Sequence, residues 1–217
     1  MLVRIQQHKS RDELVRERLL PGLEGLDVEH SYHESVLPNP WLGYRAALEN
    51  LPATGHVLVL QDDVIVSKNF TPAVELIAAA NPDTVVSLYL STVPKRTLNS
   101  ARLHWGRSRY VDTHPNDLVH VIAVLWPVDK ARDLLAWVDE NPLRLQGTVF
   151  QSDDATLTRW KQFRKERVRV TIPNLVQHPD DVESIVNGHR AHSGADKGRV
   201  SAAWIGAGDP LELDWSK

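Results

Sequence analysis

The fold is decided by Val57-Leu58-Val59-Leu60-Gln61-Asp62-Asp63-Val64, a short aliphatic run that ends in two adjacent carboxylates. An unbroken run of Val and Leu predicts a strand that is buried on both faces of a parallel sheet. Ligands of open α/β sheets bind beyond the carboxyl ends of the strands, which is where Asp62 and Asp63 emerge. Two ionised carboxylates repel each other unless a cation lies between them. The pair therefore either holds a divalent cation such as Mg²⁺ or Mn²⁺, or simply begins a solvated turn.

Strand-like and helix-like stretches alternate on both sides of this run. The expected strands are 2–5, 27–32, 57–60, 84–90, 118–126 and 168–172. The expected helices begin after Ser10 and Asn39 and span 72–80, 128–140 and 152–164. The stretch 91–117 is less regular, and we interpret it as an extended excursion or hairpin. This alternation predicts an α/β layered fold with a mostly parallel sheet.

Composition narrows the class of protein. The 217-residue chain has no cysteine, which excludes disulfides and thiolate metal sites. Because no window has the length of a signal peptide or a transmembrane helix, we expect a cytoplasmic protein without membrane contacts. The formal net charge of −3 gives no overall attraction to nucleic acid. The motifs GxxxxGK[ST] and GxGxxG are absent, which argues against the usual NTPases and dinucleotide-binding proteins.

Two further groups of polar residues also lie where a predicted helix begins or a predicted strand ends. Ser152-Asp153-Asp154 opens a predicted helix, although acids in a first turn are also expected from capping and the helix dipole alone. His178 follows the last apolar run, and imidazole is a reasonable ligand for Mn²⁺.

The order of these signals resembles the GT-A class of nucleotide-sugar-dependent glycosyltransferases, in particular its small soluble, DxD-type members. Gln61-Asp62-Asp63 is close to the EDD variant of the DxD motif, with Gln in place of the first acid. The resemblance implies a Rossmann-like central sheet flanked by helices. It also implies a divalent cation, Mn²⁺ or Mg²⁺, on the diphosphate of a donor such as a UDP-sugar. We expect a catalytic domain over 1–185 and a Gly-rich tail over 186–217 that packs on it.

The resemblance also assigns roles to individual residues. Asp63 would be the direct metal ligand, Asp62 would face the ribose or bind the metal through water, and His178 would complete the metal site. Asp154 would be the catalytic base and Asp153 its partner or an acceptor ligand. For contacts with the nucleotide we select the residues that follow the first strand, which are Gln6, Gln7 and Arg11. A single base carboxylate favours inverting transfer to a hydroxyl.

The acceptor is less defined, and two basic clusters bear on it. The clusters span 95–110 and 159–169, and both mix Lys and Arg with aromatic residues. Such mixtures suit a phosphate backbone with bases stacked on Trp105 or Trp160, or they are ordinary solvated surface. The acceptor is accordingly a small molecule, a protein or DNA that carries a hydroxymethylated base.

Two other functions stay open. The first is a metal-dependent phosphodiesterase or nuclease that uses the four acids Asp62, Asp63, Asp153 and Asp154, although it would need a further bridging carboxylate in a spaced motif. The second is a non-catalytic module that binds nucleotides or nucleic acid.

Overall fold

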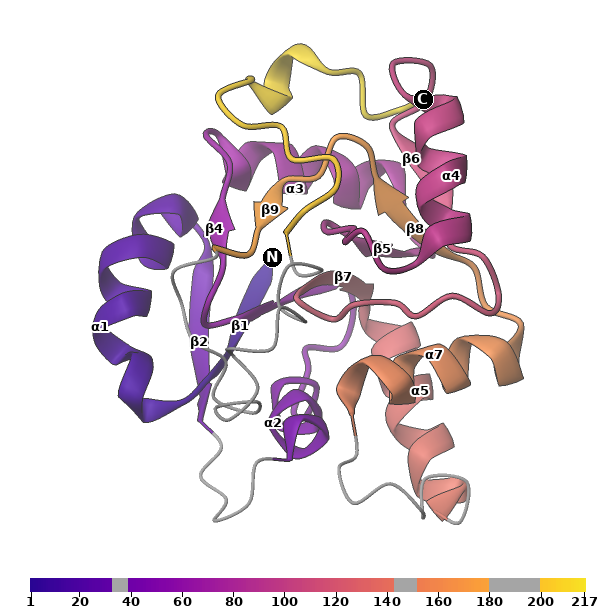
Figure 1. The fold of residues 1–217 in the computed structure, drawn as a ribbon. Helices are drawn as coiled ribbons and strands as arrows, with labels where there is room; N and C mark the ends of the chain where they lie inside the picture. The colour runs from indigo at the N-terminus through magenta and orange to yellow at the C-terminus, as the bar shows by residue number, and fades with distance from the viewer. Residues whose placement is uncertain (33–38, 143–151, 180–199) are drawn as a thin grey trace, which may run out of the picture.

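The computed structural model describes residues 1–32, 39–142, 152–179 and 200–217. Its centre is a seven-stranded sheet of order β2-β1-β3-β7-β5-β8-β6, with helices on both faces (Figure 1). Strands β2, β1, β3, β5 and β8 run in one direction, and β7 and β6 run in the opposite direction. The sheet is therefore mixed but mostly parallel, and the predicted Rossmann-like α/β class is confirmed.

The strands of the large sheet are β1 Leu2–Gln7, β2 Asp27–Tyr32, β3 His56–Gln61, β5 Val85–Ser87, β6 Tyr110–Asp112, β7 Ala123–Pro127 and β8 Val168–Thr171. A separate two-stranded ribbon pairs β4 Ile65–Val66 with β9 Val176–Gln177. The α-helices are α1 Asp12–Leu14, α2 Pro40–Ala47, α3 Phe70–Ala80, α4 Lys95–His104, α5 Val128–Glu140 and α7 Asp153–Arg164. A 3-10 turn, Lys9–Arg11, precedes α1, and α1 continues through a π turn, Val15–Leu19, and a 3-10 turn, Leu20–Leu23. A last 3-10 turn, Pro210–Glu212, lies near the C-terminus.

Strand β3 is buried on both faces, as its aliphatic run predicts. Leu58 and Leu60 pack in the layer that contains α3 and the turns after α1. Val57 and Val59 pack in the opposite layer, with α2, α5 and α7. Alternate side chains of one strand thus enter two cores, because successive residues of a strand point to opposite faces. This double burial fixes β3 in the middle of the sheet and brings its polar end to the sheet edge.

The prediction for 91–117 as an excursion or hairpin is wrong, because this stretch contains α4. The helix buries Leu98 and Ala101 against β6 and β8 and carries polar residues on most of its other positions. Too few apolar residues therefore recur at helical spacing to predict a helix from the sequence. Strand β7 also begins at Ala123, later than expected. The backbone N–H groups of Val119 and Val121 donate to side chains of α7 instead of to a neighbouring strand.

Residues 200–217 return over the domain. Ser201 forms a bridge with Ser91, and Trp204 forms one with Asn174. The Trp215 side chain is buried, and its backbone carbonyl accepts a hydrogen bond from the Tyr110 hydroxyl. The first part of the predicted tail, 186–199, lies outside the described residues. Within the described part of the chain, we find no helix with the length and apolar character needed to cross a membrane.

Candidate functional site

The first polar cluster lies where the chain order of the sheet reverses. Strand β1 lies between β2 and β3, so the crevice beyond β1 and β3 is the switch point at which doubly wound sheets bind ligands. Arg11 follows β1, and its Nη1 lies 3.0 Å from Asp62 Oδ1 and 2.8 Å from Asp63 Oδ2. All three side chains are buried. The carboxylate pair is therefore held in the protein by a guanidinium and does not begin a solvated turn.

Asp62 is also tied to the end of β1 through the backbone. Its Oδ2 accepts a hydrogen bond of 2.8 Å from the His8 N–H. Burial raises the pKa of Asp62 to about 6, although Arg11 and the His8 N–H act in the opposite direction. With both oxygens engaged by Arg11 and His8, Asp62 is directed toward β1 and away from a shared metal position.

Asp63 and His178 form the part of the cluster that could take a cation. His178 follows β9, and its Nε2 lies 3.1 Å from Asp63 Oδ2 with both side chains buried. This separation suits two neighbouring ligands of one small divalent cation, and Mg²⁺-type sites often rely on few protein ligands plus substrate phosphates. Among the described residues there is no group of three or more His, Asp or Glu that could hold a metal. A cation here would have Asp63 and His178 as its ligands among the described residues, and Asp63 Oδ2 already contacts Arg11 Nη1 as well as His178 Nε2.

The two glutamines selected for nucleotide contacts differ in their surroundings. Gln7 is buried, donates to Asp12 Oδ1 at 2.6 Å and bonds His30 Nδ1 through its Oε1. Gln6 donates to the Pro40 carbonyl at 2.9 Å. In the described part of the chain its buried Oε1 has no hydrogen-bond partner. Gln6 consequently keeps an acceptor atom for a ligand or for the neighbouring Asp153.

The second polar cluster is at the start of α7. Ser152 caps the helix by accepting a hydrogen bond from the Ala155 N–H, and Asp153 Oδ1 accepts one of 2.9 Å from the Asp154 N–H. Asp153 is buried, and its Oδ2 has no partner among the described residues. Burial, followed by the charge of Asp154, raises the pKa of Asp153 to about 7. Asp153 therefore carries its proton for much of the time near neutral pH.

Asp154 is held by two donors that precede β7. Its Oδ1 accepts a hydrogen bond of 2.7 Å from the Val121 N–H, and its Oδ2 lies 3.1 Å from His120 Nδ1. Sequence reasoning assigned no role to His120. Its only local signal is a histidine inside the apolar stretch 118–126, which does not point to a partner on another element.

The basic cluster 159–169 is mostly structural. Trp160 is fully buried against Trp126 and donates to Asp133, so the idea that it stacks on a base is wrong. Lys161 is buried and donates to Thr113 Oγ1 and to two backbone carbonyls. Burial lowers the pKa of Lys161 to about 8. Other ion pairs of this stretch join Arg164 to Asp133 and Glu140, Arg167 and Arg169 to Asp112, and Glu166 to Lys130.

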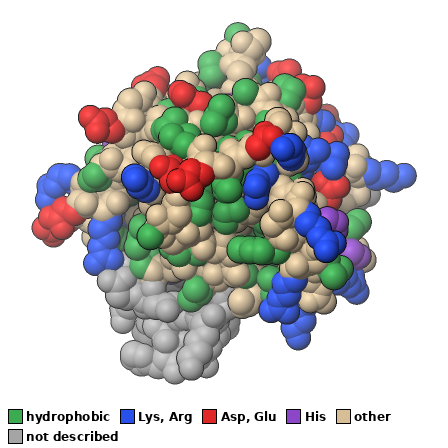
Figure 2. All heavy atoms as spheres, turned by 90° about the horizontal axis from the view of Figure 1, so that it is seen from above, with side chains coloured by type: hydrophobic (Ala, Val, Ile, Leu, Met, Phe, Trp, Pro, Cys, Tyr) green, Lys and Arg blue, Asp and Glu red, His purple; other side chains and the backbone are tan. Residues whose placement is uncertain are grey.

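The cluster 95–110 keeps an exposed basic surface. It includes four exposed cations, Lys95, Arg96, Arg102 and Arg107, with the exposed apolar side chains of Leu103 and Trp105. We call this set the α4 surface. Within the described residues none of the four cations has an ion pair. Figure 2 shows Lys and Arg side chains gathered on the side of the molecule where α4 lies.

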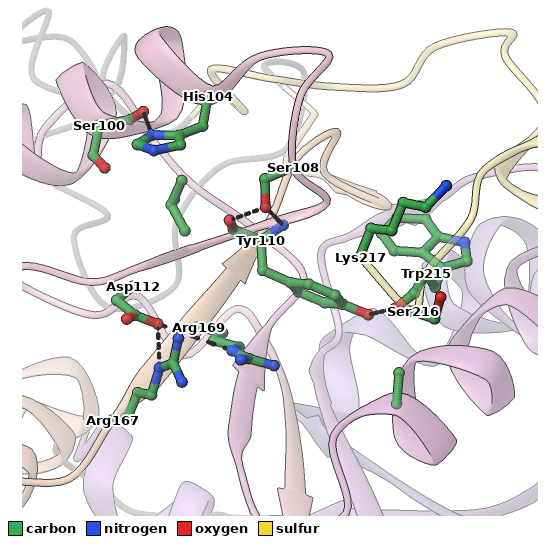
Figure 3. Close-up of a pocket in the computed structure, with 12 residues that line it drawn as sticks. Ser100, His104, Ser108, Tyr110, Asp112, Arg167, Arg169, Trp215, Ser216 and Lys217 are labelled. Atoms are coloured by element: carbon green, nitrogen blue, oxygen red, sulfur yellow. Dashed lines mark hydrogen bonds and ion pairs between the residues drawn. The ribbon is translucent and has the colours of Figure 1, made fainter.

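A pocket of about 370 Å³ lies apart from both carboxylate clusters, between α4, β6, β8 and the C-terminal residues (Figure 3). Arg167 in its lining pairs with Asp112, and Arg169 donates to Asn81 and lies over the Tyr110 ring. The pocket contains none of the acids at the carboxyl edge of the sheet. We therefore place the candidate site at the switch point and α7, where buried and shifted acids converge.

The strand order and the switch-point site define a Rossmann-like α/β protein with acids at the carboxyl edge of its sheet. No protein-family model matches the chain, and no curated protein matches it. Among solved structures, 33 chains match. One of them is the apo crystal structure of mouse xyloside xylosyltransferase 1, with 12% identity, a TM-score of 0.47 and coverage of 94% of this chain and 94% of that chain. Likeness at this level of identity concerns the fold alone.

Proposed function

We propose that this protein transfers a glycosyl group from a nucleoside diphosphate sugar, such as a UDP-sugar, to a hydroxyl group with inversion. The observation that carries the proposal is the pairing of two acidic clusters at one sheet edge. One contains Asp63 and His178 at the switch point, and the other contains Asp153 and Asp154 at the start of α7. The first suits a diphosphate and its cation, and the second suits proton removal.

The proposed reaction is a direct displacement. The acceptor oxygen forms a bond to the anomeric carbon while the bond from that carbon to the diphosphate oxygen breaks, and the electron pair leaves with the nucleoside diphosphate. Asp154 takes the acceptor proton. Asp63 and His178 would hold a Mn²⁺ or Mg²⁺ ion, which would supply positive charge to the leaving diphosphate when bound. Arg11 holds Asp62 and Asp63 in place for that contact.

The two other functions receive less support. A two-metal phosphodiesterase needs carboxylates that bridge a pair of cations. Asp62 is instead directed to Arg11 and the His8 N–H, and Asp154 is directed to Val121 and His120. A purely binding module leaves the raised pKa of Asp153 and the ordered carboxylate of Asp154 without a purpose.

The donor site can be tested by thermal denaturation with a panel of nucleoside diphosphate sugars, with and without Mn²⁺. A ligand that binds the folded state raises its stability by mass action, so donor and Mn²⁺ together should raise the Tm more than the two separate shifts combined. Asp63→Asn and His178→Ala should lose the Mn²⁺-dependent part. The matched control is Asp83→Asn, which changes an exposed acid before β5. A Mn²⁺-dependent shift that persists in Asp63→Asn would contradict the donor site.

For the acceptor, our proposal is DNA that carries a hydroxymethylated base, bound along the α4 surface. The four cations of this surface attract a phosphate backbone, and Trp105, which is 53% exposed, offers a face for a flipped base. The α4 surface is also connected to the candidate site through Asp117. Its Oδ2 accepts hydrogen bonds from the backbone N–H and the hydroxyl of Thr97 in α4, and Asp117 precedes His120 by three residues in the sequence.

Salt dependence tests the acceptor. If DNA lies on the α4 surface, log Kd should change with log salt by about 0.9 for each phosphate neutralised on a duplex. Arg102→Gln with Arg107→Gln should reduce that slope and leave donor binding unchanged. The control pair Arg16→Gln with Lys68→Gln removes the same charge from exposed sites elsewhere and should leave the slope unchanged. Absence of DNA binding at low salt would leave a small molecule or a protein as acceptor.

A further inference from the structure

Ser91, His120 and Asp154 form a continuous hydrogen-bonded chain that joins three elements. Ser91 follows β5, His120 precedes β7, and Asp154 lies in the first turn of α7. Ser91 Oγ lies 2.8 Å from His120 Nε2, and His120 Nδ1 lies 3.1 Å from Asp154 Oδ2. The contact between His120 and Asp154 spans 34 positions of sequence, so it depends on the tertiary fold.

The bonding partners determine where the protons lie. An ionised carboxylate only accepts hydrogen bonds, so Nδ1 of His120 carries the proton that faces Asp154. Ser91 Oγ accepts a hydrogen bond of 3.1 Å from the Val93 N–H, and its own proton is available to donate to Nε2 when Nδ1 carries the proton of a neutral ring. This arrangement selects the Nδ1–H tautomer of His120.

The exposed fractions of the three side chains show which end of this hydrogen-bonded chain is accessible to a substrate. Ser91 is fully buried, whereas the side chains of His120 and Asp154 are 15% and 23% exposed. A buried hydroxyl cannot reach an incoming substrate, so the three residues do not act as a serine nucleophile with its base. Ser91 is the inner anchor, and Asp154 is the accessible end. The ring between them is further fixed by an edge-on contact with Tyr89.

We infer that His120 is a positioning residue for glycosyl transfer, which orients the Asp154 carboxylate toward the acceptor hydroxyl while Ser91 holds the ring. This inference rests on the proposed function. The Val121 N–H and the His120 Nδ1–H fix the two oxygens of Asp154, so the carboxylate cannot rotate away from the acceptor.

Kinetics of substituted proteins test this role. His120→Leu removes the donor, and turnover should fall about 10- to 100-fold, the scale of a lost hydrogen bond to a charged group. The KM for the donor sugar should not change. His120→Asn places an amide N–H near the position of Nδ1 and should restore most of the activity. Ser91→Ala, which only releases the ring, should have a smaller effect than His120→Leu.

A pH profile separates positioning from a loss of folding. The titratable groups in contact with the ring are Asp154 of α7 and Tyr89 after β5. Loss of the His120 donor removes one of the two hydrogen bonds to the Asp154 carboxylate, so the pH profile of turnover should differ in shape between His120→Leu and the wild type, whereas partial unfolding would lower the whole profile uniformly. An unchanged profile together with full turnover would overturn the role.

A measurement without activity completes the test. In ¹⁵N-histidine NMR of the wild-type protein, His120 should be the Nδ1–H tautomer, and Asp154→Asn should move the proton toward Nε2. An Nε2–H tautomer in the wild type overturns the inference. Absence of glycosyl transfer by the wild type overturns the proposed function and this role with it, whereas transfer by His120→Leu at the wild-type rate overturns this role alone.

Discussion

Replacing Asp154 by Asn is expected to lower glycosyl transfer at least ~100-fold, the usual scale for loss of a general base. The amide keeps the size of the side chain and can still accept the hydrogen bond from the Val121 N–H. It cannot take the acceptor proton. Donor affinity should therefore survive, and single-turnover rates measured with saturating donor and Mn²⁺ should show the whole loss.

Asp153→Asn is the matched control. Because burial raises the pKa of Asp153, the neutral acid is the main form of this residue below neutral pH, and Asn resembles that form. Its oxygen can still accept from the Asp154 N–H, and its amide can donate toward Oε1 of Gln6, which has no hydrogen-bond partner among the described residues. Asp153→Asn should keep most of the activity. If Asp153→Asn is inactive and Asp154→Asn is active, the two roles are exchanged.

Much of the fold could be predicted from local pattern. The helix α5 has the predicted bounds, Val128–Glu140, because its apolar residues recur at helical spacing over its whole length. β3 could be predicted because an unbroken run of Val and Leu is typical of a strand that is buried on both faces. α4 could not, since only a narrow face of it is apolar and its outer face is basic. The late start of β7 could not be predicted either. The backbone N–H groups that precede β7 donate to side chains of α7, and a local sequence pattern does not show such tertiary contacts.

The acids of the site could be predicted for a related reason. Asp62 and Asp63 end a strand and Asp153 and Asp154 begin a helix, so their places at the sheet edge follow from the elements that carry them. Their partners could not be predicted. The contact of Arg11 with Asp62 spans 51 positions of sequence, and that of His178 with Asp63 spans 115. Contacts of this kind are set by how the elements pack.

Replacing Arg11 by Met should be the most destabilising substitution at the site. The guanidinium bonds both Asp62 and Asp63 in a buried setting, and removing one partner of a buried ion pair typically costs about 3–5 kcal/mol. Urea denaturation at pH 7 measures the loss. The control is Arg167→Met, because the pair of Arg167 with Asp112 is more than half exposed on the arginine side and should contribute no more than about 1 kcal/mol.

The same variant separates the structural role of Arg11 from the cation site. Adding Asp62→Asn to Arg11→Met removes one of the two buried charges and should recover part of the lost stability. If Asp63 and His178 hold a divalent cation, Mn²⁺ should stabilise Arg11→Met more than the wild type, because the cation then also replaces the missing positive charge. Further loss of the Mn²⁺ effect on adding His178→Ala to Arg11→Met would assign that cation to the Asp63 and His178 pair. Equal Mn²⁺ stabilisation of the wild type and Arg11→Met would instead show that the cation and the guanidinium act on separate groups.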